Sequence, residues 1–533
     1  MSPIRLGVCP HTMVGAAMAA WFAAALIPSA DAAAQRPAPG AASGSVQAAV
    51  AAARRHREGS ETAIVRELAG LLAIPNVAAD SVNIRRNAEH LVAMLRRRGA
   101  EARILDNDGH PPAVFGELRA PGATRTIVMY AHYDGQPVDS SQWASPPWTP
   151  TLRTGVLGLP GVREMPIPER GRLDGEWRIY ARSASDDKSP IVAMLAAIDG
   201  LRAAGIPLGV NVKFFLEGEE EAGSPNLQAM LERHRALLGA DLWLFCDGPV
   251  HQTRRPQVVF GVRGSLGLEM AVYGPTRGLH SGHYGNWAPN PAALLAQLVA
   301  SMRDDDGRIT IANYGDDVRP ITAAERAALA TVPDVDAQLR RDFGLARTEA
   351  ENAPLGERIM LPAINVRGLE AGHVGALAAN AIPTIARASI DFRLVPDQTP
   401  ARVRSLVEAH LRGRGWHIVR DEPDSATRLA HPRIVRLRWG LGYPATRTAI
   451  DLPASQALLR VVEEATGERT IAVPTLGGSL PMHAFGEVLG VPLIVLPMVN
   501  HDNNQHAANE NLRLRNLWQG IELYAAVLAG MQW

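Results

Sequence analysis

The sequence predicts an α/β protein with a smaller domain inserted into a larger one, on two observations. The first is that short apolar stretches typical of buried strands alternate with helical patterns. The strand candidates are Thr126–His132, Val210–Leu216, Leu242–Cys246 and Val491–Val499. Buried strands separated by helices indicate an α/β domain with a largely parallel sheet.

The second observation is a different order of elements in the middle of the chain. Strands are expected at Leu266–Tyr273, Ala363–Gly368, Ile385–Val395 and Trp416–Arg420, with helices at Asn290–Met302 and Thr399–Leu411. This order is the split βαβ pattern of a ferredoxin-like domain. We therefore expect one domain from residues 46–261 and 441–533, with a second domain inserted into it at 262–440. Residues 304–360 interrupt the inserted domain with a polar, partly helical segment, and the Gly- and Pro-rich residues 155–171 are expected to form a rim loop.

The N-terminus has the pattern of a signal peptide. Arg5 precedes an apolar stretch from Met13 to Ile27, and small residues suited to cleavage follow at Ala32 and Ala34. The stretch is shorter than the ~20 residues that span a bilayer, which disfavours a membrane anchor, and no later stretch is apolar enough to span one. We therefore expect a signal peptide at 1–34, a linker at 35–45, and export to a bacterial periplasm or the medium.

The composition argues against several classes of partner. Lys plus Arg and Asp plus Glu both number 54, so the formal net charge is zero. No overall field then attracts nucleic acid or an anionic membrane, and we expect no nucleic-acid partner. Cys9 lies in the expected signal peptide, so Cys246 has no partner for an internal disulfide or a thiolate metal site.

Five short segments place acids or histidines at the end of an expected strand or in the turn after it. They hold His132 and Asp134; Asp186 and Asp187; Glu217, Glu219, Glu220 and Glu221; Asp247; and His506. In open α/β sheets this carboxyl edge is where ligands bind. Each segment alone has an ordinary explanation, such as helix capping by Asp186 and Asp187 or a solvated charge run.

Taken together, the five segments fit a divalent metal site. Two histidines with several carboxylates favour zinc, and manganese or cobalt suits the same ligands. Two metals ~3.5–4 Å apart can share one bridging water and lower its pKa toward ~7. A carboxylate beside that water can take its proton and pass it to a leaving nitrogen, which indicates a hydrolase.

In this order the segments resemble the M20 family of metallopeptidases, in particular its carnosinase-like dipeptidases and carboxypeptidases. The resemblance covers nearly the whole chain after the leader. It implies a zinc-peptidase α/β/α catalytic domain, an inserted domain at 262–440 that acts as a lid and in dimerisation, and two zinc ions per subunit. By motif, the implied metal ligands are His132, Asp186, Glu221, Asp247 and His506, with Asp186 between the metals. Glu220 is the implied general base and Asp134 the implied support of His132, whereas Glu217 and Glu219 are not implied to touch a metal.

The resemblance also implies substrate contacts from the lid. His280 would reach the active site of the other subunit in a homodimer formed through the lid and stabilise the oxyanion there. Arg393 would bind the substrate carboxylate, because a guanidinium pairs with both carboxylate oxygens; its ordinary alternative is a surface salt bridge. Asn380 and Ser479 match further substrate-contact positions.

Three residues depart from the family pattern. Ala181, Ser183 and Ser189 stand where the family usually has glycine, so the shape of the loop around Asp186 is in question. The expected activity is hydrolysis of a dipeptide or of a C-terminal peptide bond. A deacylase of N-acyl amino acids with a free carboxylate uses the same chemistry and stays open, and a non-catalytic metal- or peptide-binding protein is the distant alternative.

Overall fold

The computed structural model describes residues 39–533, with side chains from Ser45 onward. The expected signal peptide therefore lies outside the described residues. Helix α1 (Pro39–Leu72) begins inside the expected linker, so residues 39–45 are helical and do not form a linker. Proline suits the first turn of a helix, where its missing N–H has no intrahelical partner to lose. In the described part of the chain, no helix has the length and apolar content needed to cross a membrane.

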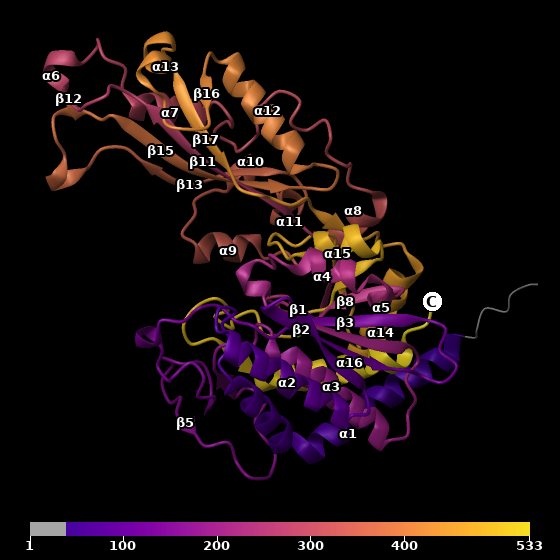
Figure 1. The fold of residues 1–533 in the computed structure, drawn as a ribbon. Coiled ribbons are helices and arrows are strands. Elements are labelled where there is room, and N and C mark those ends of the chain that lie inside the picture. Colours follow the sequence, from indigo (N-terminus) through magenta and orange to yellow (C-terminus); the bar gives the residue numbers. More distant parts are fainter. Residues whose placement is uncertain (1–38) are drawn as a thin grey trace, which may run out of the picture.

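The larger domain is built on a mixed sheet that has eight strands within residues 39–533 (Figure 1). In spatial order the strands are β1 (Glu101–Asn107), β2 (His110–Leu118), β7 (Asn211–Glu217), β3 (Thr126–His132), β8 (Leu242–Phe245), β20 (Leu493–Val495), β9 (Gln257–Val259) and β19 (Ile471–Val473). The central strands β7, β3, β8 and β20 run parallel. Their carboxyl ends therefore meet at one edge, which is where an α/β sheet binds its ligands.

Helices cover both faces of this sheet because alternate strand residues face opposite ways. Ile127, Met129 and Ala131 of β3 pack toward one helical layer, and Val128 and Tyr130 toward the other. The first layer contains α1, α2 (Ser81–Arg97), α3 (Lys188–Ala203), α14 (Pro453–Thr466) and α16 (Leu514–Gly530), and the second contains α4 (Leu227–Arg233), α5 (Arg235–Leu238) and α15 (Met482–Leu489).

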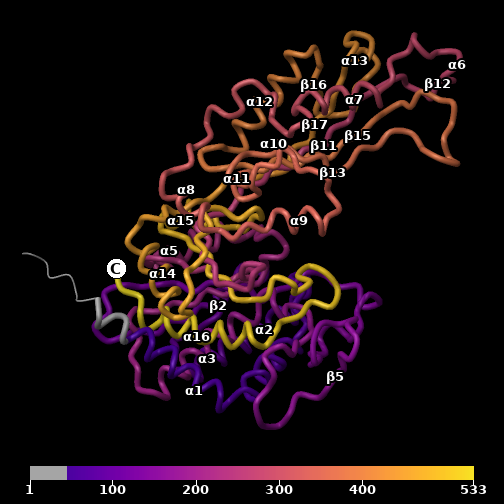
Figure 2. The backbone as a smooth tube through the Cα atoms, turned by 180° about the vertical axis from the view of Figure 1, so that it is seen from behind, coloured from indigo at the N-terminus to yellow at the C-terminus, as the bar shows by residue number. Residues whose placement is uncertain are grey.

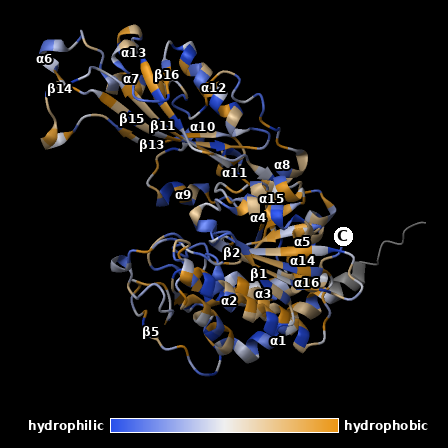
Figure 3. Ribbon diagram, in the orientation of Figure 1, coloured by the Kyte–Doolittle hydropathy of each residue, from blue (hydrophilic) through white to orange (hydrophobic). Residues whose placement is uncertain are grey.

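Three helices of the first layer illustrate this arrangement. Helices α1 and α16, from opposite ends of the described chain, lie side by side below the sheet (Figures 1 and 2). Helix α2 shows both hydrophilic and hydrophobic residues in Figure 3, as expected for a helix with one buried face.

A smaller sheet of the larger domain lies beside the site. Its strands in spatial order are β21 (Asn511–Arg513), β6 (Arg178–Tyr180), β4 (Thr151–Arg153) and β5 (Glu164–Met165). The register pairs Asn511 with Tyr180, so the segments that follow β6 and precede β21 are held together. β5 lies within the expected rim loop at 155–171. A 3₁₀ turn, η1 (Ser140–Gln142), follows β3 in the chain.

The inserted domain has a five-stranded sheet in the described chain. Its order is β13 (Ala363–Glu370), β15 (Ile385–Leu394), β11 (Gly264–Tyr273), β17 (Ile434–Trp439) and β16 (His417–Val419). Helices α7 (Pro291–Ala300) and α12 (Pro400–Gly413) cover one face, packing on Leu266, Leu268 and Met270. The split βαβ order is as predicted, and β17 is an additional strand inserted between β11 and β16. The predicted fold class is thus confirmed.

The end of the inserted domain that is remote from the larger domain is formed by short elements (Figure 1). They are β12 (Leu279–His280), α6 (Ser281–Tyr284), η3 (Gly375–Leu377), β14 (Ala381–Ile382) and α13 (Ser425–Ala430). β12 pairs with β14, which brings His280 opposite Ala381. Trp287, Val374 and Leu377 expose more than two thirds of their surface near these elements.

The interruption at residues 304–360 bridges the two domains. It contains α8 (Ala323–Leu329), α9 (Asp336–Asp342), α10 (Glu349–Asn352) and α11 (Leu355–Ile359). Glu325 of α8 forms a buried ion pair of 3.1 Å with Arg447, in the short ladder of β10 (Gly261–Val262) and β18 (Thr446–Arg447). Arg263, between β10 and β11, donates to the carbonyl groups of Arg358, Ile359 and Leu361. The interruption therefore packs where the chain passes between the domains.

Candidate metal centre

The predicted site residues lie at the carboxyl ends of neighbouring strands. β3 ends at His132, which pairs in the ladder with Glu217 at the end of β7. Asp247 follows β8 by two residues, and Asp186 and Asp187 directly precede α3. His506 lies in the turn between β20 and β21. Parallel pairing of β7, β3 and β8 thus brings segments that are far apart in the sequence to one point.

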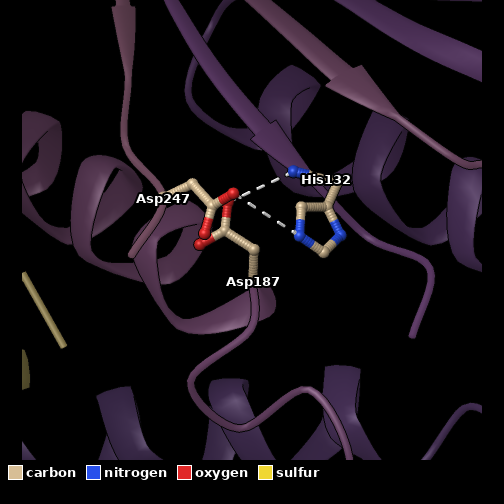
Figure 4. Close-up of side chains that lie close together, drawn as sticks. All are labelled: His132, Asp187 and Asp247. Carbon is tan, nitrogen blue, oxygen red and sulfur yellow. Dashed lines mark hydrogen bonds and ion pairs between the residues drawn. The ribbon is translucent and has the colours of Figure 1, made fainter. Parts of the chain in front are cut away.

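The inner part of the site contains His132, Asp187 and Asp247, all buried (Figure 4). Nε2 of His132 lies 3.9 Å from Oδ2 of Asp247. Oδ2 of Asp187 accepts a hydrogen bond of 3.2 Å from the backbone N–H of His132, and its Oδ1 has no hydrogen-bond partner among the described residues. One potential ligand atom from each residue lies within 4.8 Å of the others.

The outer part contains Asp186, Glu221 and His506. Nε2 of His506 lies 3.1 Å from Oδ2 of Asp186 and 3.2 Å from Oε2 of Glu221. The His506 side chain is 54% exposed, so this part opens to solvent. Oδ1 of Asp186 lies 2.8 Å from Nε2 of His132. The Asp186 carboxylate therefore faces a histidine of the inner part with one oxygen and a histidine of the outer part with the other.

Amide side chains complete the outer part. Gln136 donates to Oε2 of Glu221 at 2.7 Å, and Gln505 donates to Oδ2 of Asp186 at 3.0 Å. Both glutamines supply donors that orient a carboxylate without adding charge.

Asp134 connects the histidine to the acidic turn. Its Oδ1 and Oδ2 accept the backbone N–H groups of Glu220 and Glu221 at 3.1 and 3.0 Å. Its Oδ1 also lies 3.4 Å from Nδ1 of His132, on the side of the ring opposite Nε2. The Glu220 carboxylate comes to 4.0 Å from Nε2 of His132. One buried carboxylate thus fixes the position of the imidazole and of both glutamates.

Burial and mutual repulsion favour the protonated form of several acids here. Burial, together with the charge of Asp186, raises the pKa of Asp247 to about 7. Burial holds the pKa of Glu220 well above its usual value; His132 opposes this, while Asp247 and Asp186 add to it. The pKa of Asp187 is also raised well above its usual value by burial and by Asp247. Negative charge is costly at this point unless a cation offsets it.

The same excess of carboxylates raises the pKa values of the two histidines. Hydrogen bonds to Asp186 and Glu221 raise the pKa of His506 to about 10. Burial opposes the charge on His132, but hydrogen bonds to Asp134 and Asp186 raise its pKa well above the usual value. Burial would raise the pKa of Asp186, yet the bonds from His132 and His506 lower it. The carboxylates thus stabilise positive charge at this point of the site.

These residues fit a pair of divalent metal ions. Imidazole and carboxylate are ligands for zinc and similar metals, and neither part of the site contains a thiolate. The unpartnered Oδ1 of Asp187 and the buried like charges are the features that bound cations relieve. Asp187 was not among the predicted site residues. Its only sequence signal was its place beside Asp186, where helix capping was the alternative, and its side chain makes no cap bond to α3.

The other two glutamates of the acidic run have separate partners. Glu217 accepts from the hydroxyl of Tyr130 at 2.8 Å, and burial raises its pKa to about 7. Glu219 accepts two hydrogen bonds from Asn226, at 2.9 and 3.0 Å, just before α4. The run is therefore divided between two carboxylates at the candidate metal site, Glu220 and Glu221, and two that bond to other side chains, Glu217 and Glu219.

The four residues predicted to contact substrate fall into two separate places. Arg393 donates to Oγ of Ser479 at 3.1 Å and pairs with Asp391 at 2.8 Å, where the two domains meet. His280 and Asn380 lie together at the remote end of the inserted domain, where the N–H of Ser281 bonds to the carbonyl of Asn380. Figure 1 shows this end far from the larger domain, so one subunit does not bring His280 or Asn380 to its own metal centre.

At the carboxyl edge of the parallel central strands, two adjoining groups of three residues could each hold a metal ion, an arrangement that fits a metallohydrolase with a dinuclear site. A family model described as Peptidase family M20/M25/M40 matches residues 128–530. The chain therefore belongs to this family, and it is an enzyme that hydrolyses peptide bonds.

Relatives in several organisms are similar over most of their length. The chain is 25% identical over 480 residues to the Cys-Gly metallodipeptidase of Schizosaccharomyces pombe, covering 86% of this chain and 94% of that one. It is 26% identical over 456 residues to the human Beta-Ala-His dipeptidase, covering 82% and 83%. An M20 family metallo-carboxypeptidase from Sulfolobus solfataricus superimposes with a TM-score of 0.70 at 28% identity, covering 88% and 99%.

The expected export of the protein is corrected by these relatives. The fungal Cys-Gly metallodipeptidases among them are enzymes of cytosolic type, which contradicts the prediction of a periplasmic or secreted protein. The prediction depended on the composition of residues 1–34 alone. An apolar run followed by small residues is not constrained by packing against other parts of the protein. It is therefore weaker evidence than a residue pattern that a fold requires.

Proposed function

We propose that the protein is a dinuclear zinc exopeptidase that cleaves the peptide bond beside a free C-terminal carboxylate, with dipeptides as its first substrates. The observation that carries this proposal is the Asp186 carboxylate, whose two oxygens lie 2.8 Å from His132 and 3.1 Å from His506. A carboxylate placed in this way suits a bridge between two cations. In this proposal, residues 46–261 and 441–533 form the catalytic domain around the metals, and residues 262–440 form the inserted lid domain.

The proposed ligands are divided by the geometry of the two parts. His132 and Asp247 would hold one ion, Glu221 and His506 the other, and Asp186 both. Asp187 is an added candidate for the inner ion, because its free Oδ1 lies among the same atoms. Two such ions supply Lewis acidity that brings the pKa of a water toward ~7. The ligand set also suits manganese or cobalt, and zinc is the choice favoured by its two imidazoles.

Glu220 is the proposed general base. Its backbone is fixed by Asp134, and its carboxylate stands 4.0 Å from Nε2 of His132 with only part of its surface exposed. Burial keeps its pKa well above the usual value, which suits a group that accepts a proton and returns it to the leaving nitrogen. Asp134 is proposed to act through His132 and Glu220, not on substrate.

Arg393 and Ser479 are proposed to hold the substrate carboxylate. They lie in contact where the two domains meet, and Arg393 has a second oxygen partner in Asp391. The fork of a guanidinium can engage both carboxylate oxygens. Ser479 donates its hydroxyl to the carbonyl of Arg263 at 2.8 Å and accepts from Arg393, so it helps to orient the guanidinium for this contact. The names of the relatives support a substrate with a free C-terminus, since they include dipeptidases and a carboxypeptidase.

His280 and Asn380 are proposed to act in the active site of a second subunit. Their distance from the metal centre of their own subunit supports this, as does the exposed apolar surface of Trp287, Val374 and Leu377 nearby. β13 is an edge strand whose outward residues are largely exposed, and an open edge of this kind suits pairing with another copy. A homodimer through the inserted domain would use both features.

The test is a substrate screen with purified protein loaded with zinc, manganese or cobalt. Dipeptides, longer peptides, N-acyl amino acids and the C-terminal amides of each are compared by release of free amine. The proposal expects turnover of dipeptides with a free carboxylate and little turnover of their amides. Preference for N-acyl amino acids over every dipeptide would instead make the protein a deacylase on the same site.

A further inference from the structure

Glu510 is a fully buried glutamate that is not among the metal-facing residues. It lies at the end of the His506 loop (residues 501–510), directly before β21. Its backbone carbonyl accepts the N–H of Ala181 at 3.2 Å, continuing the pairing of β21 with β6. This places its side chain beneath the Asp186 loop (residues 181–187), which comes from more than 300 residues earlier in the sequence.

The carboxylate of Glu510 accepts four hydrogen bonds, all from the Asp186 loop. Oε1 accepts the backbone N–H groups of Ser185 and Asp186 at 2.8 and 2.9 Å. Oε2 accepts the N–H of Ser183 at 2.9 Å and Nη1 of Arg182 at 2.8 Å. Both oxygens are therefore occupied, and the carboxylate has no open position for a metal. Its contacts instead fix the backbone that carries Asp186.

The Asp186 loop needs such a support in this chain. Ser183 has φ of 60°, in the left-handed region that favours glycine. Its Oγ accepts a hydrogen bond of 2.8 Å from Asn76, which also donates to the carbonyl of Tyr133. Gly135 leaves the room for this hydroxyl, because a Cβ there would come within 2.4 Å of it. Side-chain and carboxylate contacts thus hold a loop shape that glycine would otherwise adopt freely.

The two loops joined by Glu510 carry the two residues that meet in the outer part of the site. Asp186 and His506 approach to 3.1 Å, and His506 is 54% exposed, so few other contacts fix it from the solvent side. Removing the carboxylate would leave three buried backbone N–H groups without their acceptor, and the loops would have to move to satisfy them.

We propose that Glu510 is a positioning residue of the metal centre: it locks the Asp186 loop to the His506 loop and so sets the geometry with which Asp186 and His506 hold the outer metal ion. This rests on the proposed ligation by those two residues. Partners that orient ligands in this way change metal affinity by about 10- to 100-fold when they are removed.

The test measures how firmly the full-length protein retains Co²⁺. Protein loaded with Co²⁺ is titrated with a chelator while the visible absorption of the bound ion is followed. The wild type is expected to retain two ions, and Glu510→Gln to lose one of them at about 10- to 100-fold lower chelator concentration. Glu510→Asp, which keeps the charge but is shorter, is expected to fall between the two.

The matched control is Glu325→Gln, which also removes a buried Glu–Arg pair but lies at the junction of the domains. It is expected to lose thermal stability without a change in Co²⁺ retention. Wild-type retention of both ions by Glu510→Gln, or by Glu510→Asp if the amide prevents folding, would overturn the inference. A wild type that binds fewer than two ions would instead refute the proposed function.

Discussion

Asp134 lies 3.4 Å from Nδ1 of His132, on the side of the imidazole opposite Nε2, and both side chains are fully buried. The same carboxylate accepts the N–H groups of Glu220 and Glu221. The Asp134 carboxylate therefore orients the proposed ligands His132 and Glu221 and the proposed base Glu220. Asp134, two residues after the end of β3, can therefore influence the site through these hydrogen bonds without contacting a metal ion or the substrate.

Replacing Asp134 should disturb all three partners. In Asp134→Asn, the amide NH₂ would face a backbone N–H or the Nδ1–H of His132, so at least one bond is lost. We expect metal affinity to fall by about 10- to 100-fold, with a fall in kcat that excess metal restores only in part. The measurement is kcat as a function of free zinc. Asp139→Asn, at an exposed acid in the following turn, is the control, and identical zinc dependence of the two variants would contradict the role of Asp134.

Glu220→Gln tests the base separately from the ligands. The amide has nearly the same shape but does not accept a proton at neutral pH. We expect both metal ions to be retained and kcat to fall by about 10²- to 10⁴-fold, with KM little changed. Metal content by elemental analysis and steady-state kinetics measure the two effects. A variant with near-normal turnover would exclude Glu220 as the base.

Much of the fold follows from local patterns in the sequence. The strands that end at His132 and before Asp247 are continuous apolar runs, and their parallel pairing then places the acids and histidines at one edge. β17 was missed because arginines alternate with its apolar residues, so Ile434–Trp439 resembles a charged surface segment as much as a strand. Alternation is a weaker signal in so short a segment.

The residues that sequence alone does not reveal are those whose role depends on distant contacts. The loop backbone determines which part of the site Asp186 and Asp187 each face. Asp187 faces the inner part, and Asp186 faces the outer part and also reaches His132. Glu510 acts across more than 300 residues of sequence, and no spacing rule connects it to Asp186. The role proposed for His280 involves a second subunit, and no local pattern in the sequence of one chain describes a contact between subunits.

Arg393 should determine the preference for a free carboxylate. Arg393→Gln is expected to raise KM for a dipeptide and lower kcat/KM by about 10- to 100-fold, because a charge-assisted pair is lost. The C-terminal amide of the same dipeptide should be affected far less, so the preference for the acid shrinks. The control is Arg387→Gln, which alters an exposed arginine on the same strand, 3.8 Å from Glu370. Equal losses for acid and amide would contradict a carboxylate contact.

Glu217 should make the stability of the metal-free protein depend on pH. Burial raises its folded pKa to about 7 from an ordinary 4.5, so the folded state binds the proton more tightly than the unfolded state. Its contribution to stability is complete below pH 4.5 and is lost as the pH rises through 7. The loss is at most about 3 kcal/mol, from the size of the shift.

Glu217→Gln removes that ionisation and keeps an oxygen for the Tyr130 hydroxyl. The difference in unfolding free energy between pH 5 and pH 8, measured by urea denaturation with chelator present, should be smaller in the variant than in the wild type. Glu219→Gln, which alters a glutamate bonded to Asn226, serves as the comparison. The same pH dependence in Glu217→Gln and wild type would show that Glu217 does not titrate in this range.

The proposed action of His280 in a partner subunit has a distinctive consequence for mixed dimers. His280→Ala and Glu220→Gln should each be nearly inactive alone, the first for lack of the partner's imidazole and the second for lack of a base. When the two are mixed and allowed to exchange subunits, half of the dimers are hybrids, and one of the two sites in each hybrid has both residues intact. Mixing should then restore about one quarter of wild-type activity, as follows from two-fold symmetry. Sedimentation of the same samples checks that dimers are present. Dimers that exchange but recover no activity would place the action of His280 within its own subunit or outside the reaction.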